Sequence, residues 1–298
     1  MPALTTTITT DAVGDDVHRL LADVAADDGR FPLSDHLRIE LADGDRHGFV
    51  AVMVHDGERL VGYAQLAALP ATRTVEIVID TDRRDDLAVR SSLLSAAREV
   101  VSAEGGGPLQ WWAFDASDLD HQAARAAGLR PSRTLLQLRR DLPTGLTVEV
   151  DTRPFVPGRD EDAFVAVNNR AFATHPEQGG WTVDVLRQRE REPWFDPSGF
   201  LLHERDGRLA AFCWTKLHDA ARPEEVVGEI YVIAVDPDFQ GFGLGRQLTI
   251  AGLDAIARRG VTTGMLYVEA ANVAALGMYE RLGFHTHRTD VAFTGTVT

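Results

Sequence analysis

The residues best suited to chemistry in this sequence form a glycine-rich turn between a strand and a helix. The apolar run from Glu229 to Val235 is rich in β-branched and aromatic residues, as a buried strand is. Asp236-Pro237 ends this run, and the segment Gln240–Gly245 then leads into a helical pattern that continues to about Arg259. Glycines let a backbone come close to a ligand, and the N–H groups at a helix N-terminus attract anions. The pattern predicts a pyrophosphate-binding turn, although it contains neither G-x-G-x-x-G nor G-K-[ST].

The order Q-x-x-G-x-G in this turn resembles the acyl-CoA signature of the GNAT superfamily of N-acetyltransferases. The resemblance implies that the strand pairs with the pantetheine arm of acetyl-CoA, that the Val235 N–H polarises the thioester carbonyl, and that the turn binds the pyrophosphate. A helix that starts near residue 272 would add further contacts. The acetyl-CoA contacts expected from this resemblance are Ile233, Ala234, Val235, Gln240, Gly241, Phe242, Gly243, Leu244, Gly245, Arg246, Asn272, Val273, Ala274, Ala275, Leu276 and Gly277.

Glu229 stands in an otherwise apolar strand that reaches the expected cleft. Acetyl transfer needs a neutral amine, so a carboxylate at this place could accept the ammonium proton through a water molecule. The alternative is a strand-end carboxylate that lies in solvent or pairs with an arginine. With the glycine-rich turn beside it, we expect Glu229 to be the general base.

Tyr279 lies seven residues after Asn272, on the same face of the predicted helix. Its phenol, with a reference pKa of about 10, suits a general acid that protonates the departing thiolate. The alternative is a tyrosine packed in the core beneath the helix. Asn272 could cap the helix and also contact the CoA arm, and these two roles are compatible.

Cys213 and His175 are weaker candidates for chemistry. Cys213 lies in the middle of a predicted strand without an evident activating base, so we expect a buried apolar residue and not an acyl-cysteine intermediate. His175 lies in a predicted loop, where a histidine is more often solvated or a simple contact than a base.

The order of predicted elements occurs twice along the chain. The first copy has a helical region and then strands, helix, strand, helix and strand, at residues 11–42, 49–54, 60–66, 74–79, 87–101, 109–114, 121–127 and 133–138. The turn Asp56-Gly57 recurs at Asp206-Gly207, and Ile79 corresponds to Val235, at offsets of roughly 150 residues. We therefore predict an α/β chain with mixed sheets, made of two tandem GNAT domains. The expected ranges are 1–142 for a degenerate N-terminal domain and 143–298 for a catalytic C-terminal domain, with a linker at residues 142–145.

The first copy has lost the glycines of the turn. Asp85, Leu87 and Val89 stand in the places of the three glycines, and added carboxylates should repel a pyrophosphate. We therefore expect a structural role for this copy. Residual phosphate binding could come from Arg83, Arg84 and Arg90, and residual acetyl-CoA contacts from Ile77, Val78 and Ile79.

Several segments of the second half closely resemble the mycothiol synthase family of tandem-GNAT enzymes. They are NNRAFATHPEQGGW, FCWTKLH, the strand GEIYVIAVDP with its glycine turn, and LYVEAANVAALGMYERLGF. Members of that family acetylate the cysteinyl amine of a glucosamine–inositol pseudo-disaccharide, which is the last step of mycothiol formation. The agreement is weaker in the first half, and Ala271 departs from the aspartate of the family. The substrate contacts implied by the resemblance are Asp35, Glu177, Lys216, Glu229 and Tyr267.

Lys216 is the single lysine among 30 basic residues. A hydroxyl-rich ligand is well recognised by convergent carboxylates and a cationic donor, and a compact ammonium differs from a planar guanidinium in that role. The alternative is a chance survivor of arginine-biased codon use.

Composition limits the remaining possibilities. The net charge of −15 disfavours nucleic acid and anionic membranes as partners. One cysteine excludes an internal disulfide and a cysteine-rich metal site, and we expect no metal. The first residues lack a basic start and an apolar run, and no stretch is long and apolar enough for a membrane span, so we expect a soluble, cytoplasmic monomer.

Two other functions remain open from the sequence. One is a tandem GNAT that acetylates another small amine, such as an aminoglycoside or an amino acid. The other is a CoA-sensing protein without catalytic activity, although the intact glycine turn and Tyr279 argue against it.

Overall fold

The computed structural model describes residues 4–43, 48–69, 72–173, 178–218 and 226–298. The chain forms two compact units. Unit 1 consists of Met1–Leu136, Glu269–Ala271 and Arg288–Thr298, and unit 2 consists of Gln137–Val268 and Asn272–His287. No helix of the described ranges is long and apolar enough to cross a membrane.

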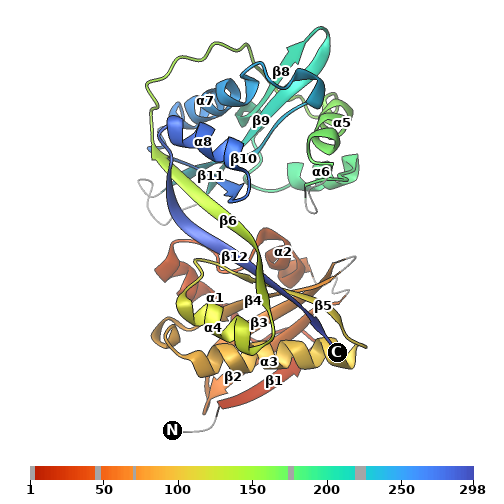
Figure 1. Cartoon of the computed structure of the whole chain (residues 1–298), viewed down its shortest axis with the longest axis vertical. Coiled ribbons are helices and arrows are strands. Elements are labelled where there is room, and N and C mark those ends of the chain that lie inside the picture. Colours follow the sequence, from red (N-terminus) through yellow and green to blue (C-terminus); the bar gives the residue numbers. More distant parts are fainter. Residues whose placement is uncertain (1–3, 44–47, 70–71, 174–177, 219–225) are drawn as a thin grey trace. The chain divides into compact units, whose positions relative to one another are not determined.

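Unit 1 is a mixed sheet with helices on both faces (Figure 1). Its strands follow the order β1-β2-β3-β4-β5-β12-β6, in which β4 and β5 are parallel and β12 is His285–Val297. The elements are β1 (Leu4–Thr9), α1 (Asp15–Asp28), α2 (Asp35–Asp43), β2 (Val50–Asp56), β3 (Arg59–Leu69), β4 (Thr72–Ile79), η1 (Thr81–Arg83), α3 (Leu87–Ala103), β5 (Gly107–Ala113), α4 (Asp118–Ala126) and β6 (Arg130–Asp141).

The two faces of the unit 1 sheet have separate apolar cores. Leu20 and Leu37, of α1 and α2, pack with Tyr63 on one face. Leu93 of α3 and Ala124 of α4 belong to the cluster on the other face. Successive residues of a strand point to opposite faces, so a sheet covered on both sides has strands that are apolar along their whole length. This explains the nearly continuous buried pattern of β2 and β3.

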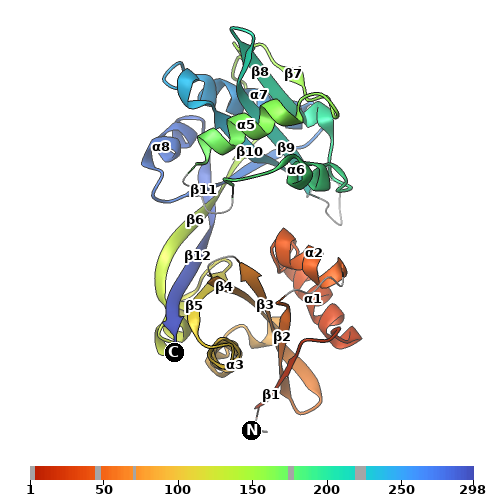
Figure 2. The same ribbon diagram turned by 90° about the vertical axis from the view of Figure 1, so that its right-hand side faces the viewer.

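Unit 2 repeats this plan, with α5 and α6 on one side of the sheet and α7 on the other (Figure 2). Its strand order is β6-β11-β10-β9-β8-β7, and β10 and β11 are parallel. The elements are β7 (Arg153–Pro154), α5 (Glu161–Ala171), α6 (Val183–Glu190), η2 (Pro197–Gly199), β8 (Phe200–Arg205), β9 (Arg208–His218), β10 (Val227–Val235), η4 (Pro237–Phe239), α7 (Leu244–Ala257), β11 (Thr263–Glu269), α8 (Val273–Arg281) and β12 (His285–Val297).

Helix α7 lies very close to the strands that carry the site. An added Cβ at Gly228 of β10 would lie 2.1 Å from Ile256 Cγ2, and one at Gly252 would lie 2.5 Å from Cys213 Sγ. Both contacts are too short for a side chain, so these glycines allow the helix to approach β9 and β10. On the opposite face, Phe164 of α5 packs edge-on against Phe212 with ring centroids 4.6 Å apart.

The last strand of the chain completes the sheet of unit 1. Residues 291–297 of β12 pair antiparallel with residues 107–113 of β5, and Ser132 Oγ of β6 donates to the Ala292 carbonyl at 3.0 Å. Unit 1 therefore contains a segment from the end of the chain, in addition to its first 136 residues. The predicted domain ranges, 1–142 and 143–298, stay a prediction. They divide the repeated sequence into two continuous parts, whereas the compact units consist of discontinuous segments.

The predicted α/β class with mixed sheets is confirmed, and the element order of the first copy matches the structure. Gly29, with φ of 65°, is the C-cap that ends α1. Strand β1 is an addition to the predicted elements. Its LTTTIT composition, rich in β-branched residues, is typical of an edge strand and could have revealed it.

Candidate functional site

Strands β10 and β11 separate halfway along their length. Their parallel pairing runs from Val227–Thr263 to Ile230–Leu266, whereas β10 continues to Val235. A register shift against β9 between Ile230 and Val232 marks a bulge at Tyr231, and bulges bend a strand away from its neighbour. The β11 side of residues 233–235 is thus the place where an extended ligand could pair with the backbone, as the sequence predicted.

The turn after β10 presents a helix N-terminus without a side-chain cap. Gly241 and Gly243 have φ of 86° and 76°, and Gly243 is the N-cap of α7. The first hydrogen bond of the helix joins the Gln247 N–H to the Gly243 carbonyl at 3.2 Å. The N–H groups of residues 244–246 therefore come before the first intrahelical hydrogen bond. An added Cβ at either glycine meets nothing within 4 Å, so the backbone conformation, and not crowding, requires glycine here. The arrangement suits a phosphate group.

In unit 1 the corresponding helix N-terminus is closed by its own side chain. Asp86 is the N-cap of α3, and its Oδ1 accepts from the Ala88 N–H at 2.9 Å and from the Val89 N–H at 3.4 Å. The carboxylate occupies the donors that would bind an anion and also repels a negative ligand.

The match between the two turns differs from the sequence prediction. Three residues, 84–86, separate η1 from α3, but four residues, 240–243, separate η4 from α7. By its place at the helix start, Asp86 corresponds to Gly243, and the prediction that Leu87 stands there is wrong. A one-residue difference in turn length causes the shift, which a constant offset could not reveal.

The arginines that could have held a phosphate in unit 1 are paired with carboxylates. Arg83 pairs with Asp56 and Asp86, and Arg84 with Asp27 and Asp28. The Nε of Arg90 lies 2.8 Å from Asp120 Oδ1, and both residues are buried. A cavity of about 370 Å³ persists where β4 and β5 separate, and its lining includes Ile77, Val78, Ile79, Arg84 and Arg90.

Three predicted substrate contacts of unit 2, Glu229, Lys216 and Tyr267, share one face of its sheet. Glu229 and Lys216 are register partners on β10 and β9, and each is only 7% exposed. Tyr267 comes two residues after Met265, the partner of Glu229 on β11, and therefore lies on the same face. The Lys216 ammonium lies 4.7 Å from the ring centroid of Trp194, within cation–π distance.

Sequence reasoning missed residues of this face that the tertiary structure adds. His218 Nε2 lies 2.7 Å from Glu229 Oε2. Arg189 Nε donates to the Tyr231 hydroxyl at 3.3 Å. Burial raises the pKa of the Tyr231 phenol, the Glu229 carboxylate adds to the rise, and Arg189 and Lys216 oppose it. The period of two along a strand could have found His218, since it follows Lys216 on the same face.

Tyr279 lies in α8 with its side chain almost completely buried. It is 6% exposed and packs edge-on to Phe284 with ring centroids 5.6 Å apart. Burial raises the pKa of its phenol above the usual value, so the hydroxyl keeps its proton throughout the neutral range. Asn272 caps α8, because its Oδ1 accepts from the Ala275 N–H at 3.2 Å.

The remaining candidates have separate outcomes. Cys213 is fully buried, and burial raises the pKa of its thiol to about 12, so the prediction of an inert core residue is confirmed. The Tyr267 hydroxyl accepts from Gln137 Nε2 at 2.7 Å. Asp35 is the first residue of α2 in unit 1, and His175 and Glu177 lie outside the described residues.

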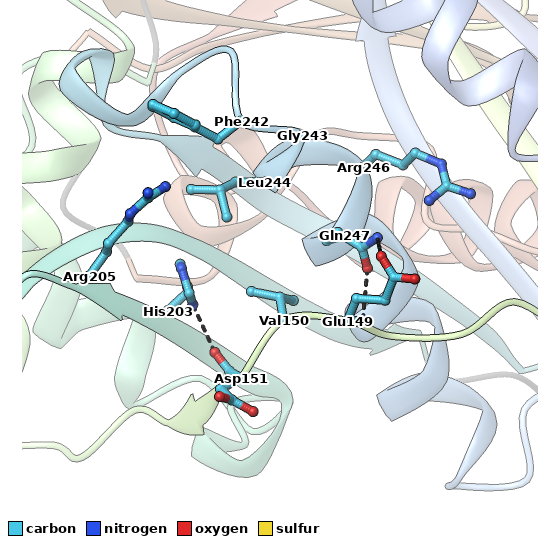
Figure 3. Close-up of a pocket in the computed structure, with 10 residues that line it drawn as sticks. All are labelled: Glu149, Val150, Asp151, His203, Arg205, Phe242, Gly243, Leu244, Arg246 and Gln247. Atoms are coloured by element: carbon cyan, nitrogen blue, oxygen red, sulfur yellow. Dashed lines mark hydrogen bonds between the residues drawn. The ribbon is translucent and has the colours of Figure 1, made fainter.

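A cavity of about 560 Å³ borders the glycine turn of unit 2 (Figure 3). Its wall combines Arg205 and Arg246 with Glu149, and the Arg205 guanidinium lies 4.5 Å from the ring centroid of Phe242. The Glu149 N–H donates to Gln247 Oε1 at 3.0 Å. No lining residue comes from β10, β11 or α8, so this cavity is separate from the face that holds Glu229.

Comparison with known proteins agrees with this geometry. The Acetyltransferase (GNAT) family model matches residues 167–284. A mycothiol acetyltransferase of Acidothermus cellulolyticus is 42% identical over 93% of this chain and 89% of its own length, and one of Streptomyces coelicolor is 43% identical over 94% and 90%. The chain belongs to the mycothiol acetyltransferase family. It is therefore an acyltransferase of the GNAT type.

Solved structures support the fold. A GCN5-related N-acetyltransferase of Sphaerobacter thermophilus matches with a TM-score of 0.73 and 21% identity, over 99% of this chain and 96% of that one. A tandem GNAT protein from the clavulanic acid biosynthesis pathway matches with a TM-score of 0.71 and 17% identity, over 99% of both chains. At these identities the likeness concerns the fold, and the predicted tandem GNAT architecture is confirmed.

Proposed function

We propose that the protein transfers the acetyl group of acetyl-CoA to the cysteinyl amine of 1D-myo-inositol 2-(L-cysteinylamino)-2-deoxy-α-D-glucopyranoside, which yields mycothiol. The observation that carries the proposal is the separation of β10 from β11 directly after buried Glu229 and before an uncapped, glycine-lined helix N-terminus. The acceptor is the one that the family resemblance implies, and relatives named mycothiol acetyltransferase that align along nearly the whole chain support it.

Unit 2 binds the acetyl donor in this proposal. The backbone of residues 233–235 pairs with the pantetheine arm, and the Val235 N–H polarises the thioester carbonyl. The N–H groups of residues 240–246 bind the pyrophosphate, and residues 272–277 add contacts at the start of α8. Unit 1 binds acetyl-CoA much more weakly through Ile77–Ile79, because Asp86 already occupies the N-terminus of α3.

Two side chains move the protons of the reaction. Glu229 accepts the ammonium proton, through a water molecule, and the neutral amine attacks the thioester carbon. The new C–N bond forms, the C–S bond breaks, and Tyr279 gives its proton to the departing thiolate. An α-amino group has a pKa of roughly 7.7–8.0, so a single carboxylate suffices as base.

The acceptor is recognised on the face that carries Lys216 and Glu229. The Lys216 ammonium and the Tyr267 hydroxyl donate hydrogen bonds to the hydroxyl groups of the pseudo-disaccharide. The carboxylates accept hydrogen bonds from these hydroxyl groups. Glu177 and Asp35 are retained as contacts from the family resemblance. The buried position of Lys216 argues for a specific role and against a chance lysine.

The test is acetylation of the purified cysteinyl pseudo-disaccharide, followed by mass spectrometry of the product. We expect one acetyl group on the cysteinyl nitrogen, and a loss of roughly 100-fold or more in kcat for Glu229→Gln with unchanged acetyl-CoA affinity. The matched control acceptor is the glucosaminyl-inositol without cysteine, which should not react.

Three outcomes would count against the proposal. Turnover of an aminoglycoside or amino acid, but not of the pseudo-disaccharide, would indicate another small-amine acetyltransferase. Acetyl-CoA binding without turnover of any amine, unaffected by Glu229→Ala, would indicate a CoA-sensing protein. Full activity of Glu229→Gln would remove Glu229 as the base.

A further inference from the structure

We propose that His218 is a positioning residue, which holds the Glu229 carboxylate in the orientation that accepts the amine proton. The inference rests on the proposed role of Glu229 as base. His218 is the last residue of β9, and its Nε2 lies 2.7 Å from Glu229 Oε2. The segment FCWTKLH ends at this histidine, but the family resemblance assigned no role to it.

The sheet register makes this contact a fixed feature of unit 2. Lys216 is the register partner of Glu229, and His218 is the partner of Val227. His218 is therefore the diagonal neighbour of Glu229 on the same face, within reach of a long side chain. Both side chains project from paired strands and not from loops, so the distance between them depends on the backbone ladder.

Burial explains why Glu229 needs such a partner. The Glu229 side chain is 9% exposed, and the His218 side chain is 36% exposed. A carboxylate removed from water needs a hydrogen-bond donor to offset the lost hydration. The Lys216 ammonium, on the register partner of Glu229, lies 4.7 and 5.4 Å from the ring centroids of Trp194 and Tyr231.

The geometry assigns different tasks to the two carboxylate oxygens. His218 donates its Nε2 proton to Oε2, which leaves Oε1 to accept the proton of the amine or of an intervening water molecule. With Oε2 held, rotation of the carboxylate about its last bond is restricted, and Oε1 stays directed at its target. Loss of such a supporting contact typically costs about 10- to 100-fold in activity.

The role requires a donor at the position of Nε2 and does not require an imidazole. A glutamine can place its amide N–H close to that position, whereas leucine fills the space without a donor. We expect His218→Gln to keep kcat within about threefold of wild type, and His218→Leu to lower it about 10- to 100-fold. Acetyl-CoA KM should change less than about twofold in both variants, because the cofactor turn is untouched.

The matched control is His285→Leu, at an exposed position in the same unit outside the proposed site. This variant should keep wild-type kinetics. Equal melting temperatures of the three variants would exclude unfolding as the cause of a loss. A result that overturns the inference is wild-type kcat in His218→Leu, or an equal loss in the glutamine and leucine variants.

A second measurement does not depend on activity. ¹⁵N NMR of the wild-type imidazole should show a proton on Nε2 of His218, and Glu229→Ala should abolish that preference. A proton on Nδ1 and none on Nε2 in the wild-type protein would overturn the inference. If the pseudo-disaccharide were not acetylated but the Nε2 tautomer were found, the proposed substrate would fail while the contact would stand.

Discussion

Gly243→Asp should reproduce in unit 2 the blocked helix N-terminus of unit 1. Gly243 is the N-cap of α7 and has no side chain to offer, whereas Asp86 caps α3 with two hydrogen bonds. Aspartate caps a helix in the extended backbone that Asp86 has, with φ of −92° and ψ of 99°, so residue 243 must leave its left-handed φ of 76° to make the same cap. The substitution thus fills the donors of the cradle with a carboxylate in place of the ligand phosphate.

The size of the effect follows from these contacts. Displacing a carboxylate from backbone donors costs about 1.5–3 kcal/mol for a charge-assisted bond, and repulsion between aspartate and pyrophosphate adds to this. A total loss of about 3 kcal/mol corresponds to at least about a 100-fold weaker Kd for acetyl-CoA. Gly243→Asn keeps the cap without the charge and should cost only about 1 kcal/mol, or about fivefold. Gly243→Ala adds only the strain of φ near 76°, about 1–2 kcal/mol in the free energy of unfolding.

Isothermal calorimetry with acetyl-CoA measures all three variants. The expected order of affinity is wild type, alanine or asparagine, and then aspartate by a wide margin. A second, weaker binding event that persists in Gly243→Asp would belong to unit 1. A Kd of Gly243→Asp within about threefold of wild type would refute the reasoning, because the glycine turn would then not be the phosphate site.

Three further substitutions test other parts of the structure. Tyr279→Phe should lower kcat about 100-fold with an unchanged Kd for acetyl-CoA, and an unchanged rate would exclude Tyr279 as the acid. Because the pKa of the wild-type phenol is raised, its ionisation should not limit turnover below about pH 10. Burial raises the pKa of Glu76 from 4.5 to about 7, so the unfolded state loses its proton first and the free energy of unfolding falls by about 3 kcal/mol as pH rises between these values. Urea unfolding at pH 5 and pH 8 should show a smaller fall in the free energy of unfolding for Glu76→Gln than for wild type. The glutamine amide oxygen can still accept a hydrogen bond from the Ser34 N–H, whose nitrogen lies 2.7 Å from Glu76 Oε2. An equal fall in both proteins would be contrary evidence. Gly228→Ala should lower the melting temperature by the equivalent of about 1–3 kcal/mol, because its Cβ would overlap Ile256, and a neutral effect would show that α7 is not held so tightly.

Much of unit 2 could be predicted from the sequence because its signals are local. The strand before the turn, the glycines with positive φ and the helix after them all depend on residues within about 20 positions. Asn272 as a helix cap and Cys213 as a buried residue are local in the same sense. The prediction of which residues correspond in the two turns was wrong by one position, because a sequence offset carries no information about where a helix begins.

Only the tertiary structure decided how distant residues meet. The sequence by itself determined a repeated α/β fold, an intact glycine turn in one copy and its loss in the other. Register between β9 and β10 placed His218 against Glu229, and the pairing of β12 with β5 gave the end of the chain to unit 1. The physical reason is that strand pairing joins residues without any regular spacing along the chain, and a shift of one residue would turn Glu229 to the other face. The local sequence therefore determines the glycine turn, the proposed donor site, whereas the surroundings of Glu229, the proposed base, form only in the assembled sheet.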